Sequence, residues 1–142
     1  MHSYFYRGRT FLNLCLSPRT ALLIMLVALL PTGAGAQDKS ITVTLKSYDF
    51  TPDSVSLTAN TPYSLYLVND SRRDHSFSAP EFFAASTVDD QDRAKVTNGT
   101  VEVAANSSVE LRVTPVRAGQ YPLRCDHFLH ASFGMTGKII VQ

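Results

Sequence analysis

Residues 118–141, AGQYPLRCDHFLHASFGMTGKIIV, hold the most concentrated set of metal-binding side chains in the sequence. Two stretches with strand-like composition, YPLRC and KIIV, are each introduced by a glycine and enclose a loop. Cys125, His127, His130 and Met135 lie in this loop or at its start. The segment therefore predicts two β-strands whose connecting loop presents sulfur and imidazole groups at one place.

Short stretches in which apolar and polar residues alternate recur upstream of this segment. A period of two is typical of strands with one face toward a core, and turn residues separate the stretches. The pattern predicts an all-β fold, a Greek-key β-sandwich of about eight short strands with antiparallel pairing. The upstream stretches are 41–46, 55–58, 63–68, 101–103 and 109–113.

Residues 80–97, PEFFAASTVDDQDRAKVT, interrupt this alternation. We expect a surface loop here, with one helical turn near residues 81–85. Asp89, Asp90 and Asp92 make the loop acidic, and we expect these carboxylates to be solvated.

Residues 1–36 have the layout of a secretory signal peptide. Three arginines and no acidic residue precede the apolar run ALLIMLVALL, and the small-residue pattern AGA follows at 34–36. The run is far shorter than the roughly 20 residues that span a bilayer. We expect cleavage after Ala36, which leaves residues 37–142 in the periplasm or secreted, with no stable membrane span. The alternative is an uncleaved N-terminal anchor.

The predicted mature chain has the length of one domain and a nearly balanced charge. It carries 10 of the 13 Lys and Arg residues, because three lie in the leader, and all 12 Asp and Glu residues, so its formal charge is −2. This balance gives no support to nucleic-acid binding. Once the leader with Cys15 is removed, Cys125 has no cysteine partner within the chain. A lone cysteine in an exported protein is a buried bystander, an intermolecular partner, a reactive thiol or a metal ligand.

The kinds of side chain in the loop favour a metal site. A thiolate, two imidazoles and a thioether form the ligand set of blue-copper electron-transfer sites. The loop supplies Cys125, His130 and Met135, and His75 is the candidate second imidazole from far upstream. Two alternatives stay open: His127 in place of His130, and Met135 as a core residue that only fills space.

Four segments, in this order, resemble the cupredoxins, the family of type 1 or blue copper proteins. The resemblance covers nearly all of residues 37–142 and implies a cupredoxin-like copper-binding domain there. It implies His75, Cys125, His130 and Met135 as the ligands of one copper ion that cycles between Cu(I) and Cu(II). The segments are YDFTPDSVSLTANTPYSLYLVND (48–70), HSFSAPEFF (75–83), AGQYPLRC (118–125) and HASFGMTGKIIV (130–141).

The chain departs from the family pattern next to the first histidine. The family often has an asparagine at that position, where this chain has Ser76. We expect the Ser76 hydroxyl to hydrogen-bond toward the Asp126 backbone and to tie the two ligand segments together.

The resemblance implies an exported one-electron carrier and not an enzyme. The alternative is a periplasmic copper-handling protein for resistance, storage or delivery that uses the same ligands. The expected partner is a redox protein such as a c-type cytochrome or a terminal oxidase. We expect this protein to meet its partner as a monomer. We expect Phe128, Leu129 and Phe133 to form a docking face around His130. The neighbouring pair RR (72–73) is a candidate for steering an anionic partner.

Overall fold

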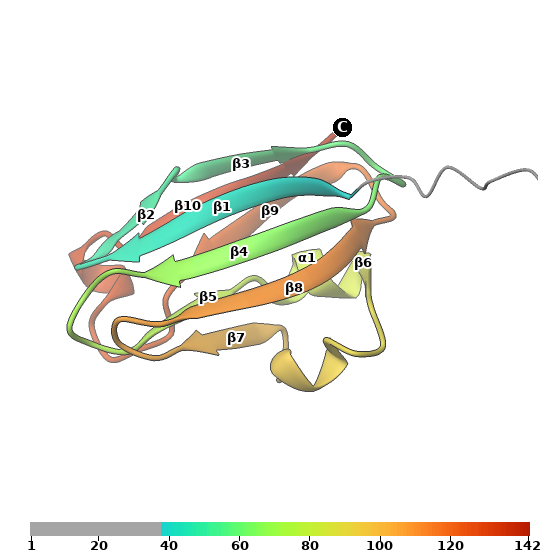
Figure 1. The fold of residues 1–142 in the computed structure, drawn as a ribbon. Helices are drawn as coiled ribbons and strands as arrows, with labels where there is room; N and C mark the ends of the chain where they lie inside the picture. The colour runs from blue at the N-terminus through green and yellow to red at the C-terminus, as the bar shows by residue number, and fades with distance from the viewer. Residues whose placement is uncertain (1–37) are drawn as a thin grey trace, which may run out of the picture. The chain divides into compact units, whose positions relative to one another are not determined.

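The computed structural model describes residues 38–142, which form a sandwich of two five-stranded β-sheets (Figure 1). The predicted signal peptide lies outside the described residues. Within residues 38–142, no helix is long and apolar enough to cross a membrane. The first sheet has the order β2 (Asp49–Thr51), β1 (Lys39–Lys46), β4 (Tyr63–Asn69), β8 (Ser108–Pro115) and β6 (Ser86–Val88). The second has the order β3 (Ser54–Leu57), β10 (Thr136–Val141), β9 (Gly119–Arg124), β5 (His75–Ser78) and β7 (Thr100–Val103).

The alternating stretches form strands whose apolar side chains face the space between the sheets. In β1, Val43 and Leu45 are fully buried while Thr42 and Lys46 are exposed. The all-β sandwich predicted from the sequence is therefore confirmed. The core reaches the end of the sandwich where the candidate metal ligands lie, since two of them are among its largest buried side chains. Those largest buried side chains are Phe50, Phe77, Phe82, Leu45, Leu65, Leu67, Leu111, Leu123, Met135, Ile139, His75 and Val43.

The strand pairing differs from the uniform antiparallel arrangement that the alternation predicted. β1 pairs in parallel with β4, and β3 pairs in parallel with β10. Both pairs arise because the chain passes to the other sheet before it returns. Strand β3, in the second sheet, separates β1 from β4 in the sequence. Alternation along one strand carries no information about the direction of its neighbour.

Ten strands are present in the described residues, where the sequence predicted about eight. The strands without an alternating stretch in the sequence, β2, β5 and β6, have three or four residues each. β5 (His75–Ser78) has the sequence HSFS with Phe77 as its single apolar residue, and a segment of this length is too short to establish a period of two.

The expected helical turn is confirmed in the 80–97 region as α1 (Pro80–Ala84), with proline in its first turn. The 3₁₀ turn η1 (Arg93–Lys95) follows later in the same region. The expectation of solvated carboxylates is wrong for Asp92, which is buried. Its carboxylate accepts hydrogen bonds from Lys95 Nζ and the Arg112 backbone N–H, and these bonds fasten the loop to β8.

The candidate metal ligands gather at one end of the sandwich because several strands begin or end there (Figure 1). β4 ends at Asn69, and a short turn leads to His75 at the start of β5. β9 ends one residue before Cys125, and β10 begins one residue after Met135. β5 and β9 are neighbours in one sheet, with Ser78 opposite Arg124. The sheet thus brings together two segments fifty residues apart.

Candidate metal centre

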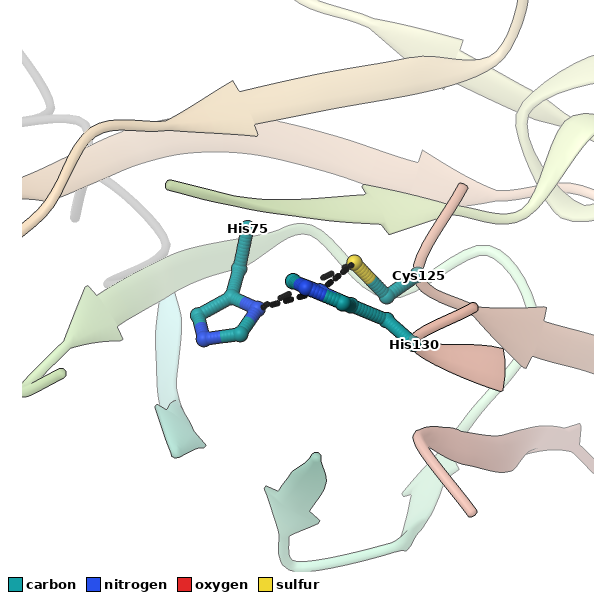
Figure 2. A group of neighbouring side chains, drawn as sticks. All are labelled: His75, Cys125 and His130. Carbon is teal, nitrogen blue, oxygen red and sulfur yellow. Dashed lines mark hydrogen bonds between the residues drawn. The ribbon is translucent and has the colours of Figure 1, made fainter. Parts of the chain in front are cut away.

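His75, Cys125 and His130 point their donor atoms at one another (Figure 2). The two Nδ1 atoms of the histidines lie 3.2 Å apart. The Cys125 Sγ atom lies 3.8 Å from Nδ1 of His75 and 3.4 Å from Nδ1 of His130. All three residues are buried, with exposed fractions of 1%, 1% and 7% in chain order. The described residues contain one group of this kind with three converging donors.

The three distances fit a first-row metal ion. The point equidistant from the three donor atoms lies about 2.0 Å from each of them. Metal–nitrogen and metal–thiolate bonds have similar lengths, of about 2.0–2.3 Å. Two imidazole nitrogens and one thiolate in a plane are the equatorial donors of a type 1 copper centre. The residues present therefore fit such an ion by both geometry and donor type.

His75 is positioned by the turn that precedes it, and Asn69 holds that turn. The buried Asn69 amide donates hydrogen bonds to the Arg73 carbonyl at 2.8 Å and the Val103 carbonyl at 2.9 Å. Its side-chain oxygen accepts a hydrogen bond from the Ser71 N–H at 3.0 Å. These three bonds link β4, the turn and β7. The position of His75 therefore depends on a buried residue that the sequence pattern did not indicate.

Ser76 ties the cysteine segment to the histidine segment. The Asp126 N–H donates to the Ser76 hydroxyl oxygen at 2.8 Å, which confirms the bond expected from the sequence. Ser76 also directs its backbone N–H at Cys125 Sγ at 3.4 Å, and its hydroxyl lies 3.7 Å from the same sulfur. Ser76 thus fixes the position of the cysteine segment and contacts its sulfur.

The ligand loop, residues 125–135, closes on itself through the backbone. The Cys125 N–H donates to the Met135 carbonyl at 3.1 Å, and the Met135 N–H donates to the His130 carbonyl at 3.0 Å. Gly134 has a φ of 103°, in the left-handed region where glycine is favoured, and it ends the 3₁₀ turn η2 (Ala131–Phe133). Met135 is completely buried and is joined by these bonds to two of the three donor residues.

His127 lies outside the group of three donors, beside it. Its ring stacks on the His130 ring with centroids 5.5 Å apart. Its Nε2 atom lies 2.9 Å from a carboxylate oxygen of Glu102. The structure therefore gathers His130, and not His127, with His75 and Cys125.

Tyr48 is a neighbour of the site that the sequence did not reveal. Its ring meets the His130 ring edge to face, with centroids 5.1 Å apart, and also contacts Phe133 at 5.2 Å. Tyr48 has a φ of 65°, which is uncommon for a bulky side chain. Isolated tyrosines of this kind carry no sequence signal, because the contact depends on how the β1–β2 turn meets the ligand loop.

Electrostatics keep both histidines neutral at neutral pH. Burial lowers the pKa of His75, and the neighbouring His130 and His127 rings lower it further. Burial also lowers the pKa of His130, with contributions from His127 and Arg73. Because the ordinary histidine value is about 6.5, both rings have a free nitrogen lone pair at pH 7.

The second nitrogen of His75, Nε2, takes no part in the convergence of the three donor atoms. Nε2 of His75 is buried and has no hydrogen-bond partner among the described residues. A histidine that binds a metal through one nitrogen ordinarily donates the proton on the other to a carbonyl or a water molecule. Nε2 of His75 is therefore the position where an ordered water molecule is expected.

Residues 19–141 match the model of the cupredoxin-like domain, and the chain belongs to this family. Together the sandwich and the convergent thiol and imidazoles define a cupredoxin with a type 1-like metal centre. A search of the curated proteins found no match.

Three solved structures illustrate the fold. Auracyanin B matches with a TM-score of 0.54 and 21% identity, over 73% of this chain and 88% of that one. The auracyanin of the photosynthetic bacterium Roseiflexus castenholzii, reduced with sodium dithionite, matches with a TM-score of 0.57 and 14% identity, over 74% and 98%. A multi-copper oxidase from Pediococcus acidilactici matches with a TM-score of 0.56 and 13% identity, over 75% of this chain and 27% of the oxidase. These identities support similarity of fold alone.

Proposed function

We propose that this chain is an exported protein that carries single electrons through one type 1 copper ion. The observation that carries the proposal is the buried triangle formed by Cys125 Sγ and the Nδ1 atoms of His75 and His130. In the proposal the thioether sulfur of Met135 would supply the fourth donor. Copper bound there supplies the Cu(I)/Cu(II) couple, since thiolate and thioether favour Cu(I) and imidazole suits both states.

The chain contributes a rigid and nearly dry setting for electron transfer. His75 and Cys125 are each 1% exposed, and the hydrogen bonds of Asn69 and Ser76 hold their segments in place. A site fixed in this way changes little between oxidation states. His130 is the donor residue closest to solvent, at 7% exposed, so electrons enter and leave by its edge. With four donors from the chain, the site has no open position for a substrate, and we propose no enzymatic activity.

The surface around His130 suits a transient redox partner. Phe128, Leu129 and Phe133 are 86%, 45% and 63% exposed, and they flank the histidine along the ligand loop. Electron-transfer encounters use small interfaces, below about 1,200 Å². We propose that a monomer of this protein meets a c-type cytochrome or a terminal oxidase here.

The direct test is the spectrum and reactivity of residues 37–142 loaded with copper. We expect one copper per chain, intense visible absorption in the oxidised form, loss of that absorption on reduction, and rapid electron exchange with a c-type cytochrome. Absorption and electron-paramagnetic-resonance spectra, followed by stopped-flow mixing, measure these properties. A colourless Cu(II) form would contradict the proposal.

A copper-handling role is the second candidate, and the position of His127 favours it. Its ring stacks on His130 and lies nearer the surface, where a passing copper ion has an additional imidazole available. A delivery protein surrenders copper to a copper-free acceptor, whereas an electron carrier retains it. Mixing the loaded protein with a copper-free acceptor and measuring the metal in each separates the two functions.

Substitutions at Met135 test whether this residue is an axial ligand or only part of the core. We expect Met135→Leu to raise the reduction potential, because leucine donates no electron pair and the lower coordination number that results favours Cu(I) over Cu(II). We expect Met135→Gln to lower it, since a harder oxygen donor favours Cu(II). Each shift should be on the order of 60 mV or more, which corresponds to about tenfold in the one-electron equilibrium. Equal potentials in all three proteins, measured by redox titration, would leave Met135 as a core residue.

A further inference from the structure

A shallow cavity of about 550 Å³ opens on the surface beside His130. It lies at the end of the sandwich that holds the candidate metal centre, between the turn before β5 and the ligand loop. The two segments that form its walls carry different side chains, cationic on the turn and aromatic on the loop. The lining residues are Arg72, Arg73, Asp74, His127, Phe128 and His130.

Positive charge predominates in this cavity. Arg72 and Arg73 are exposed, and neither forms an ion pair with any of the residues that the structure describes. The lining carboxylate, Asp74, accepts a hydrogen bond from the Ala105 N–H at 2.8 Å. The nearby Glu102 carboxylate is engaged with His127 at 2.9 Å. Two guanidinium groups are thus available to an incoming anion.

The arginine pair stands on a rigid support. The Arg73 carbonyl accepts hydrogen bonds from the Asn69 amide at 2.8 Å and the Ser71 hydroxyl at 3.0 Å. The Arg73 N–H donates to the same hydroxyl at 3.2 Å. Because the backbone of the turn is held in this way, less conformational entropy is lost when the guanidinium groups engage a ligand.

We propose that this cavity binds carboxylate side chains on the surface of the redox-partner protein, and so selects an acidic partner. The proposal rests on the proposed electron-carrier function and adds the chemistry of the partner. Guanidinium groups pair with carboxylates through two parallel hydrogen bonds, which fixes orientation as well as attraction. The arginines lie beside His130, so this pairing brings the partner to the edge from which electrons leave.

A protein surface fits this site better than a small anion does. Phe128 lines the cavity with an 86% exposed ring, and Leu129 and Phe133 extend the apolar area along the loop. An apolar centre with a charged rim is the arrangement of protein–protein interfaces. The predicted mature chain has a formal charge of −2 (10 basic and 12 acidic residues), so this local positive charge orients the molecule toward an acidic partner.

The test uses the double variant Arg72→Glu/Arg73→Glu and a matched control, Lys39→Glu/Arg117→Glu. The control reverses the same number of charges at the opposite end of the sandwich, where β1 begins and β8 ends (Figure 1). Stopped-flow mixing gives the electron-transfer rate constant of each copper-loaded protein with two c-type cytochromes, one of net negative and one of net positive charge. Each rate is divided by the rate with a neutral quinol, which corrects for changes at the copper.

At low ionic strength we expect the arginine variant to react at least about tenfold more slowly than wild type with the acidic cytochrome, and faster with the basic one. The difference from wild type should shrink at high salt, where screening shortens the range of the charges. The control variant should stay within about twofold of wild type, because its altered charges lie far from the contact.

Equal effects in the arginine and control variants would overturn the proposal, since net charge alone would then explain them. The proposal would also be overturned if the arginine variant lost the binding of wild type to phosphatidylglycerol vesicles while its rates with both cytochromes stayed unchanged. The arginines would then be assigned to a membrane surface. Failure of the electron-carrier function itself is a separate result. In that case copper-loaded wild type lacks intense visible absorption and exchanges no electrons even with the neutral quinol.

Discussion

We expect the replacement of Cys125 by alanine to abolish the intense visible absorption of the copper-loaded protein and its electron exchange with a cytochrome. This is the largest functional effect that we expect, because Cys125 supplies the single thiolate among the described residues. Its sulfur lies 3.8 Å and 3.4 Å from the two imidazole nitrogens, so its loss opens one corner of the triangle. Substitution of residues that only support metal ligands lowers metal affinity or activity by about 10- to 100-fold. Substitution of the cysteine ligand itself should therefore lower them by more than this.

The matched control for this experiment is His127→Ala. It removes a metal-binding side chain from the same loop, but one that lies outside the three convergent donors. We expect this variant to keep the colour and one copper per chain. Visible and electron-paramagnetic-resonance spectra measure the colour of each variant, and metal analysis measures its copper content. Colour retained in Cys125→Ala, or lost in His127→Ala instead, would mean that the donor set is wrong.

The spacing of the C-terminal segment predicted that side chains of one loop meet near Cys125, but it left His127 and His130 as alternatives, and the resemblance to the cupredoxins favoured His130. A loop between neighbouring strands has to return, so its residues fall close together whatever the rest of the chain does. The upstream donor, His75, was predicted from the resemblance to the cupredoxins, because no local pattern reports a contact across fifty residues. The structure brings His75, Cys125 and His130 together, and the ligand role of Met135 remains a prediction.

The residues that support the site were harder to predict, because their contacts depend on the assembled sheets. The Ser76–Asp126 bond was expected and is confirmed, but the approach of Ser76 to the cysteine sulfur depends on the packing of β5 against β9. Tyr48 meets His130 only because the β1–β2 turn folds over the ligand loop. Asn69 appears as an ordinary turn residue in the sequence. Alternation reveals which faces are buried, but it does not reveal where a buried polar group finds its partners.

Replacing Asn69 by aspartate tests how far the site depends on this buried network. The substitution preserves size, so it leaves no cavity, but it exchanges an amide donor for a carboxylate oxygen. That oxygen then faces the Arg73 and Val103 carbonyls, which received hydrogen bonds at 2.8 Å and 2.9 Å. Asn69 is 1% exposed, so water cannot replace the lost donor. Unsatisfied buried groups cost about 1–3 kcal/mol each, and we expect a loss of about 3 kcal/mol in the free energy of unfolding.

Urea denaturation of the copper-free protein measures this loss, with Asn60→Asp as the control. Asn60 is exposed in a turn at the other end of the sandwich, and its side chain makes no hydrogen bond within residues 38–142, so its substitution should change stability by less than about 0.5 kcal/mol. The network also holds the turn before His75, so Asn69→Asp should weaken copper binding by about tenfold. If the two variants unfold at the same urea concentration, Asn69 does not hold the turn. If Asn69→Asp is destabilised but binds copper like wild type, the position of His75 is set by β5 alone.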